Sequence, residues 1–274
     1  MVFSLRPQQQ RDKMKYLKLL AVFMNSSLLV DLEYRANFIV QAIMGVFQTG
    51  ITYISVALFF THTDNLGGWT YEQSLIIVGL FSIINGVIYV FMQPNIKRIV
   101  EMVRDGTMDF VLTKPVNSQF MATLRYVKYS GMANIVAGFA IIALAFGRMG
   151  YAPDAPALVA FTLMLAIAIL IVYSIWLVMG ATAFWFVKID NLAELFNTLF
   201  DTARFPITTF SGIMRIFFTF VLPVAFITTV PAQAVLGQLE WLTIAGALLM
   251  GAALFIAGSL FWRYTVRSYT SASS

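Results

Sequence analysis

The sequence predicts an all-α integral membrane protein with six transmembrane helices and further amphipathic helices at the membrane surface. Three observations lead to this prediction. Of the 274 residues, 59% are hydrophobic and only 11% are charged, whereas charged residues make up about 25% of a typical soluble domain. Six apolar runs are long enough to cross a bilayer core of roughly 30 Å as helices of about 20 residues. Basic residues are distributed very unequally between the two sides of those runs.

The six apolar runs define a transmembrane region at residues 36–262, preceded by an N-terminal segment (1–35) and followed by a short tail (263–274). The fourth run is longer than a bilayer requires, so we expect it to tilt. The fifth contains Pro223, whose missing N–H should kink the helix. The expected spans, in chain order, are 36–60, 74–93, 130–146, 157–187, 213–230 and 241–262.

Arg148 is the only Lys or Arg on one side of these spans. The others lie in the terminal segments, in loops 94–128 and 188–212, or at the span ends that adjoin them. Because cytoplasmic loops carry the excess of basic residues, both termini and both loops should be cytoplasmic. We expect the membrane to be a bacterial inner (plasma) membrane. The net charge of +5 is then a signal of topology, and we expect no nucleic acid partner.

Two segments outside the spans have the pattern of amphipathic helices. Residues 15–35 contain an apolar stretch too short to cross a bilayer, and charged residues bracket it, which favours a helix lying in the membrane interface. Residues 190–205 repeat Leu and Phe at helical spacing, and Asn191 with Glu194 resembles a capping box. We expect this second helix on the cytoplasmic side.

The most charged internal segment is "NIKRIVEMVRDG", residues 95–106. Helical spacing places four apolar residues on one face and four charged residues on the other, and Gly106 stands where a left-handed cap would end a helix. The segment could be a solvated loop helix or a docking surface for a soluble protein. The two faces are formed by Ile96, Ile99, Val100 and Val103, and by Lys97, Arg98, Glu101 and Arg104.

The chain lacks the residues of several catalytic and metal sites. It contains no GxxxxGK[ST] motif and no Gly-Lys dipeptide, so it cannot hold ATP phosphates in a P-loop. It has no cysteine and a single histidine, His62, which argues against a metal site of the usual kind. His62 has no nucleophile motif nearby, and we interpret it as a loop residue.

Neutral polar residues within the spans are the candidates for contact with a substrate or for hydrogen bonds between helices. The interiors of the first four spans and of the sixth contain no ionisable residue, which argues against an ion-coupled secondary carrier. Gly131 with Gly138, and Ala247 with Gly251, should allow close helix packing. The polar candidates are Gln41, Gln48 and Ser55 in the first span, Ser82, Asn85 and Tyr89 in the second, and Thr219 in the fifth.

Three sequence segments resemble the permease subunits of the type-2 ATP-binding-cassette (ABC) exporter superfamily. They are "VRDGTMDFVLTKPV" after the second span, "FPITTFSGIMRIFFTFVLPVAFITTVPAQAVLG" around the fifth, and the ending "FWRYTVRSYTSASS". The order of an N-terminal amphipathic helix and six spans is also similar. Within the superfamily, the chain most resembles small permeases without extra domains, which work with a separate ATPase and a second, related permease.

The resemblance implies the type-2 exporter permease fold, with residues 15–35 as an elbow helix and residues 95–110 as the coupling helix that docks on the ATPase. It implies a second contact in loop 188–204. The second and fifth spans would line the path between two permeases, through Ser82, Asn85, Tyr89, Thr219, Phe220 and Pro223. The residues expected at the ATPase are Arg98, Glu101, Arg104, Asp105, Gly106 and Asp109, with Asn191 and Glu194 in the second contact.

The function implied is that of a non-catalytic permease subunit in an ATP-driven exporter of a hydrophobic or amphipathic substrate, drug-like or lipid-like. Two ATPase copies would bind ATP and Mg, and this chain would bind no cofactor. The second permease would be a related protein or another copy of this chain, and lipids would surround both. The alternatives are an ion-coupled secondary carrier and a membrane scaffold without transport.

Overall fold

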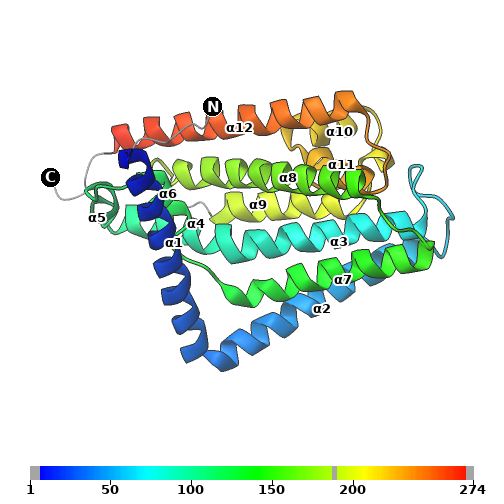
Figure 1. The fold of residues 1–274 in the computed structure, drawn as a ribbon, viewed down its shortest axis with the longest axis horizontal. Helices are drawn as coiled ribbons and strands as arrows, with labels where there is room; N and C mark the ends of the chain where they lie inside the picture. Colours follow the sequence, from blue (N-terminus) through cyan, green and yellow to red (C-terminus); the bar gives the residue numbers. More distant parts are fainter. Residues whose placement is uncertain (1–6, 187–189, 270–274) are drawn as a thin grey trace.

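The computed structural model describes residues 7–186 and 190–269, and this part of the chain is helical apart from turns and an isolated bridge between Leu66 and Trp69. The long helices form an antiparallel bundle, and α1 crosses one of its ends (Figure 1). We call this the Gly106 end, because Gly106 lies there beyond the last turn of α4, and we call the opposite end, which holds the loop with Gly67, the Gly67 end.

The helices follow one another with short connections, several of which are single 3₁₀ or π turns. The α-helices are α1 (Pro7–Glu33), α2 (Arg35–Phe59), α3 (Tyr71–Val87), α4 (Gln93–Arg104), α5 (Asp109–Leu112), α6 (Ser118–Thr123), α7 (Met132–Met149), α8 (Ala155–Thr182), α9 (Asp190–Phe200), α10 (Gly212–Ile216), α11 (Val230–Val235) and α12 (Trp241–Ser268). The other turns are η1 (Ile88–Met92), η2 (Tyr129–Gly131), η3 (Asp201–Arg204), η4 (Ile207–Thr209), η5 (Phe217–Val221) and η6 (Ala225–Thr229).

Five helices of the described ranges are long and apolar enough to cross a membrane: α2, the rod from α3 through α4, η2 with α7, α8, and α12. They correspond to the first, second, third, fourth and sixth expected spans, so these predictions are confirmed in position. The fourth ends at Thr182, earlier than expected, because the chain turns there before Phe186. Asp154 begins this helix as its N-cap and accepts a hydrogen bond from the Ala157 N–H at 2.9 Å.

The fifth crossing differs from the expected one, because α9 runs alongside α3 and α8 and packs on both (Figure 1). Aromatic contacts follow this segment from one end of the bundle to the other. Phe196 packs edge-on against Trp176 near the end of α8, and Phe200 stacks on Phe81 in the middle of α3. Phe205 then meets Phe59 at the end of α2. Residues 190–205 are therefore a crossing segment and not a helix outside the bundle.

The expected fifth span, residues 213–230, is instead part of a helical hairpin that enters and leaves at the Gly67 end. Its two arms, Gly212–Val221 and Ala225–Val235, are bent by 69° at Pro223. The chain enters the first arm from Thr209, whose backbone lies against Gly67. It leaves the second arm at Val235, whose carbonyl accepts a hydrogen bond from Tyr151 just beyond α7. Both ends of the hairpin thus lie at the same end of the bundle, which is the geometry of a re-entrant loop.

The close packing of α3 on α7 depends on two pairs of glycines. A Cβ on Gly79 would lie 2.6 Å from the carbonyl oxygen of Gly138, and a Cβ on Gly138 would lie 2.5 Å from that of Gly79. About two helical turns further along, a Cβ on Gly86 would lie 3.1 Å from the carbonyl oxygen of Gly131. Only glycines allow two backbones to approach so closely. The expected packing role of Gly131 and Gly138 is confirmed.

Replacing Gly138 with valine should lower the free energy of unfolding by about 3 kcal/mol, because backbone atoms on α3 cannot move aside as a flexible side chain could. Gly147→Val is the matched control. It lies on the same helix with nothing within 4 Å of its Cβ position. The measurement is unfolding of the purified chain in mixed micelles by titration with SDS. Equal stability losses in the two variants would contradict a glycine-dependent contact.

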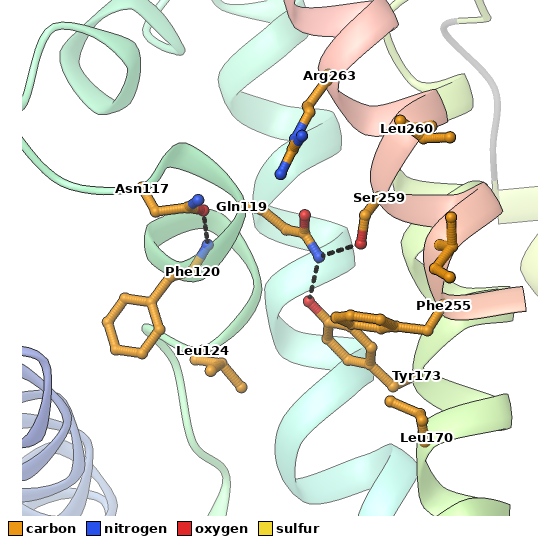
Figure 2. A pocket seen from close by; sticks show the side chains of 11 residues that line it. Asn117, Gln119, Phe120, Leu124, Leu170, Tyr173, Phe255, Ser259, Leu260 and Arg263 are labelled. Carbon is orange, nitrogen blue, oxygen red and sulfur yellow. Dashed lines mark hydrogen bonds between the residues drawn. The ribbon is translucent and has the colours of Figure 1, made fainter. Parts of the chain in front are cut away.

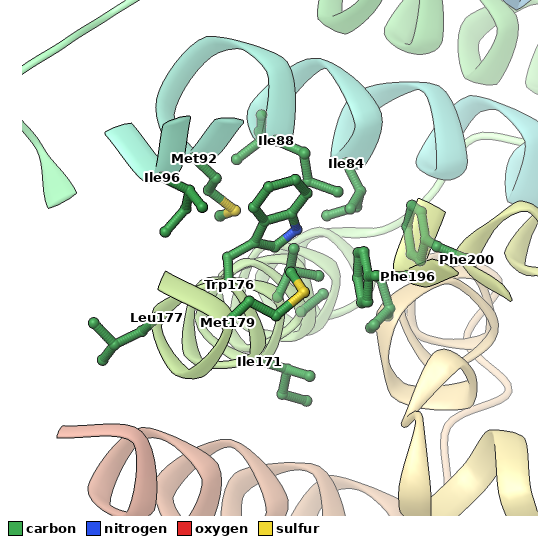
Figure 3. Packing of buried hydrophobic residues seen from close by; sticks show 14 of the residues in the cluster. Ile84, Ile88, Met92, Ile96, Ile171, Trp176, Leu177, Met179, Phe196 and Phe200 are labelled. Carbon is green, nitrogen blue, oxygen red and sulfur yellow. The ribbon is translucent and has the colours of Figure 1, made fainter. Parts of the chain in front are cut away.

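The main hydrophobic core fixes α3, α8 and α9 to one another at the level of Trp176. This side chain is 1% exposed and is surrounded by Ile84, Ile88, Met92, Phe196 and other apolar residues (Figure 3). A fully buried aromatic side chain of this size stabilises a packed interface by several kcal/mol. The core therefore holds the α9 crossing firmly against the rod formed by α3 and α4.

Helix α1 begins at Pro7, earlier than the expected start at residue 15, and runs across the Gly106 end of the bundle (Figure 1). It is tied to the segment between α6 and α7. The Asp31 carboxylate accepts a hydrogen bond from the Tyr129 N–H at 2.7 Å, and the Ser27 hydroxyl accepts one from the Val127 N–H at 3.1 Å. These bonds fix the angle at which α1 leaves the bundle.

Candidate coupling and transport site

The second span continues into the charged segment as one rod. The second span was expected to end at residue 93 and the charged helix to lie in the loop that follows, but Tyr71–Arg104 is helical throughout, with a π turn at Ile88–Met92 just before Pro94. Proline is tolerated here because it stands in the first turn of α4. The charged segment is therefore the end of a transmembrane helix and not a separate helix of the loop.

Hydrogen bonds from the chain after α6 replace the one that Pro94 cannot make. The Val90 carbonyl, which a residue at position 94 would normally bond, accepts the Lys128 N–H at 3.0 Å. Asn95 is 1% exposed. Its amide group donates to the carbonyls of Phe91 at 2.6 Å and Tyr126 at 2.7 Å, and its side-chain oxygen accepts the Tyr126 N–H at 2.9 Å. Residues 126–128 thus stabilise the rod at Pro94, where one backbone hydrogen bond of the helix is missing.

The rod ends in a Schellman motif at Gly106. The Thr107 N–H bonds the Met102 carbonyl at 2.9 Å, the Gly106 N–H bonds the Val103 carbonyl at 3.3 Å, and Gly106 has φ +68°. This is the left-handed conformation that glycine adopts without strain. The chain then reverses into the short helix α5. The expected coupling helix at residues 95–110 is therefore two helices joined by a sharp turn.

The charged residues of α4 point away from the bundle, as their spacing predicted. Ile96, Ile99 and Met102 are buried, and the side chain of Ile96 occupies the space beside Gly180 of α8. On the opposite face, Arg98 pairs with Glu101 at 2.7 Å, and both side chains are about half exposed. This amphipathic end is packed on one side and available to a partner on the other.

The remaining expected contact residues occupy the turn after α4. Arg104 and Asp105 form an exposed ion pair with a separation of 3.1 Å. Asp109 begins α5 and is half-buried. Burial raises the pKa of the Tyr269 hydroxyl, and the negative charge of Asp109 raises it further. Asp109 therefore faces the end of α12, in contrast to the outward-facing pair.

A polar cavity of about 190 Å³ lies further along the same rod. It is enclosed by α2, α3 with η1, α7, and the crossing segment α9–η3. Ser82, Asn85 and Tyr89 lie together on one face of the rod and all line the cavity. The complete lining consists of Gln48, Thr49, Thr52, Phe81, Ser82, Asn85, Ile88, Tyr89, Gln93, Asn134, Asn197 and Asp201.

Tyr89 connects the cavity with residues 126–128, which stabilise the rod at Pro94. Its hydroxyl accepts a hydrogen bond from the Lys128 ammonium at 2.7 Å and donates one to the Gln41 side chain. The same ammonium lies 4.5 Å from the centre of the Tyr89 ring, where the ring's negative face attracts a cation. Movement of residues 126–128 would therefore move one wall of the cavity.

The sequence comparison identifies the family to which this arrangement belongs. Residues 46–273 match the family model described as "ABC-2 family transporter protein". The chain belongs to the ABC-2 family. Comparison with curated proteins finds no match. ABC-2 permeases are membrane components of ABC transporters and generally pair with an ABC ATPase.

In this ABC-2 permease the expected substrate-path residues separate into two groups. Ser82, Asn85 and Tyr89 line the polar cavity, but Thr219, Phe220 and Pro223 lie in the re-entrant hairpin. The Thr219 hydroxyl bonds the carbonyl of Arg215 in its own helix, and Phe220 is 63% exposed. The hairpin therefore does not line the cavity. The structure does not bring its three expected residues together with the three residues of the rod.

The expected second docking contact also lies differently in the ABC-2 permease. Glu194 is exposed on α9 and belongs to the crossing segment. Asn191 lies within the first turn of α9, after its start at Asp190, and its side chain is outside the described residues. Residues 187–189, at the beginning of the expected loop, are outside the described residues as well.

Sequence reasoning did not single out several polar residues of the ABC-2 site, among them Lys128, Asn197 and Asp201. Lys128 was assigned to a loop, and the other two to a surface helix. Asp201 lies 3.6 Å from Arg204 on η3, so an ion pair belongs to the fifth crossing. The run of Leu and Phe at helical spacing in 190–205 indicated a helix, but nothing in the sequence distinguished a crossing helix from a surface helix there.

Proposed function

We propose that this chain is the permease subunit of an ATP-driven exporter. The substrate is hydrophobic or amphipathic, drug-like or lipid-like. Two copies of a separate ATPase bind ATP and Mg and supply all hydrolysis, while this chain is not catalytic. The second permease is a related protein or another copy of this chain. The Gly106 end and both termini are cytoplasmic, in a bacterial inner membrane.

The observation that carries this proposal is the continuity of the rod Tyr71–Arg104. Its outer face at one end carries the exposed pair Arg98–Glu101, and its middle carries Ser82, Asn85 and Tyr89 in the cavity wall. A helix transmits a displacement along its axis because its hydrogen bonds resist stretching. Closure of an ATPase pair against the charged end would therefore shift the cavity wall.

The cavity supports the substrate class and the need for a second permease. Neutral hydroxyl, amide and aromatic groups form most of its lining, together with one carboxylate, Asp201, so a weakly polar or cationic amphiphile suits it better than a sugar. Its volume of about 190 Å³ is below the range of roughly 300–1,000 Å³ for drug-sized ligands. A second subunit on the exposed apolar face of α2, at Ile43 and Phe47, would extend the site beyond the volume that this chain encloses.

Asp201 also supports one alternative function, an ion-coupled carrier, because ionisable residues within a bundle often mark ion paths. Transport by the chain alone, driven by an imposed proton or sodium gradient and lost in Asp201→Asn, would favour that function. A chain that acts only as a scaffold would transport nothing under either condition. The exporter requires ATP and a co-purifying ATPase.

Charge reversal at Glu101 tests the proposed coupling. Co-purification should recover an ATPase subunit with the wild-type chain, and vesicles containing the complex should move a hydrophobic cationic dye when supplied with ATP. In Glu101→Arg the pair with Arg98 becomes repulsive, and we expect ATP-dependent transport to fall by about tenfold or more. Glu240→Arg is the control, since Glu240 is an exposed carboxylate at the Gly67 end.

Two results would contradict the proposal. One is recovery of the chain without any ATPase. The other is unchanged transport in Glu101→Arg with the same amount of chain in the membrane. ATPase stimulation by small hydrophilic anions alone would exclude the proposed substrate class but leave the coupling role intact.

A further inference from the structure

A larger cavity than the polar one lies on another face of the bundle, between α6, α8 and α12. Its volume is about 630 Å³, which is within the range of cavities that hold a small molecule. None of its lining residues lines the polar cavity. The lining is formed by Asn117, Gln119, Phe120, Leu124, Leu170, Tyr173, Phe255, Ile256, Ser259, Leu260 and Arg263.

The pocket has a chemical gradient along α12. Phe255, Ser259 and Arg263 are spaced four residues apart, so they follow one another along one face of the helix. Arg263 lies toward the Gly106 end and Phe255 deeper in the bundle, about 12 Å away along the axis at 1.5 Å per residue. Figure 2 shows Arg263 above the polar side chains of Gln119 and Ser259, with Phe255 and Leu170 beyond them.

The polar groups in the middle of the pocket bind one another. The Gln119 amide group donates to the hydroxyl oxygens of Tyr173 at 3.1 Å and Ser259 at 3.2 Å (Figure 2). Thr123 lies 3.0 Å from the same Tyr173 hydroxyl. These bonds fix the walls of the pocket, and Trp262 adds a hydrogen bond from α12 to Ser118 of α6 at 3.3 Å.

Arg263 is the only charged residue in the lining. No ion pair or hydrogen bond of its side chain occurs within the part of the chain that the structure describes. Lys15 of α1 adds a second positive charge nearby, because its ammonium group donates to the Pro115 carbonyl, two residues from Asn117. A cation at the mouth and apolar walls below it match an anion that carries a hydrocarbon chain.

We propose that this pocket binds one anionic phospholipid. The phosphate lies against the Arg263 guanidinium, which binds phosphate through paired N–H donors, and an acyl chain lies against Leu170, Phe255 and Ile256. The Gly106 end is the proposed cytoplasmic end, where anionic lipids are abundant. The lipid fills the gap between α6 and α12, and thereby holds the segment after the coupling turn against the bundle.

Lipid retention by the full chain tests this proposal without an ATPase or a substrate. The purified chain is reconstituted in vesicles of equal parts phosphatidylglycerol and phosphatidylcholine, extracted in mild detergent, and the lipids that remain bound are quantified by mass spectrometry. We expect phosphatidylglycerol to be enriched by about tenfold, the effect of one charge-assisted contact. Excess inorganic phosphate should not displace it, because the acyl chain contributes to binding.

Two variants and a matched control complete the experiment. Arg263→Gln should abolish the enrichment. Leu260→Trp should reduce the retention of all lipid in the pocket, because it fills the cavity from a position that is 57% exposed and so tolerant of change. Arg267→Gln, one turn further along α12 and outside the lining, should behave like the wild type.

Three outcomes would overturn the proposal. Enrichment that survives Arg263→Gln would remove the assigned headgroup contact. Equal losses in the Arg263 and Arg267 variants would indicate general attraction to a basic surface. Displacement of the lipid by inorganic phosphate would indicate a phosphate site. None of these outcomes depends on transport, so they are independent of the proposed exporter function.

Discussion

Replacing Gly106 with valine should reduce ATP-dependent transport by at least about tenfold while the chain still folds and inserts. Gly106 closes the Schellman motif at φ +68°, and a β-branched residue in the left-handed conformation is strained by roughly 1–2 kcal/mol. That energy is small compared with the packing of the bundle. It acts, however, on the turn that sets the direction of α5 relative to the exposed charges on α4.

Gly150→Val separates the local effect from general backbone strain. Gly150 ends α7 with φ +60°, and the Tyr151 N–H bonds the Phe146 carbonyl at 3.1 Å in the same type of motif. It lies at the Gly67 end, away from the proposed ATPase contact. Transport should be measured in vesicles with equal amounts of each complex, and ATPase co-purification should be measured alongside it.

The two variants should therefore lose similar stability but differ in transport. If Gly150→Val impairs transport as strongly as Gly106→Val, the turn after α4 has no special part in coupling. If Gly106→Val transports normally, the geometry of the coupling turn is unimportant. A folded Gly106→Val chain that no longer retains the ATPase would support docking at this turn directly.

The five spans could be predicted because their side chains face lipid or a dry core, and hydropathy measures both. The crossing formed by α9 was missed because Asn197 and Asp201 on this segment line a polar cavity. Its apolar face, with Phe196 and Phe200, therefore looked like that of a surface helix. A sequence window averages the two faces and cannot distinguish a polar cavity from solvent.

The re-entrant hairpin was mistaken for a span for the opposite reason. Ile213 is 82% exposed and Val221 is 68% exposed, so this hairpin is apolar on its outside as a lipid-facing helix would be. Hydropathy records that surface but not the direction of the chain. The reversal depends on the break at Pro223 together with the contact of Thr209 with Gly67 and the bond between Tyr151 and Val235, which are distant in sequence.

The charged end of α4 was predicted correctly in its two faces but not in its attachment. Helical spacing is local, so it placed Ile96 and Ile99 inward and Arg98 and Glu101 outward. The behaviour of the chain at Pro94 is not local, because Lys128 and Tyr126 supply the compensating hydrogen bonds. Local patterns therefore placed the charged helix in a loop, where the folded chain has a continuous rod.

Asn95→Ala should lower the free energy of unfolding by about 3 kcal/mol and uncouple the charged end of the rod from the cavity wall. The change removes three hydrogen bonds, to the Phe91 carbonyl and to the Tyr126 carbonyl and N–H. Each is worth about 1 kcal/mol, with a further penalty where a buried polar group is left without a partner. Asn65→Ala is the control, because Asn65 is exposed at the Gly67 end and its side chain accepts one bond, from the Gly68 N–H. We expect its loss of stability to stay below about 1 kcal/mol.

The stability and the substrate-stimulated ATPase activity of Asn95→Ala together show whether the Asn95 hydrogen bonds stabilise the fold alone or also couple the ATPase to the cavity. Without Asn95, the bond between the Lys128 N–H and the Val90 carbonyl remains beside Pro94, and the neighbouring π turn can act as a hinge. ATP would still be hydrolysed, but substrate would no longer stimulate hydrolysis, because motion at Arg104 would be absorbed before it reached the cavity wall at Tyr89. Titration with SDS measures the stability, and ATPase activity with and without dye measures the stimulation of hydrolysis by substrate. A variant that is destabilised but remains fully stimulated would show that the cavity wall moves without a rigid rod.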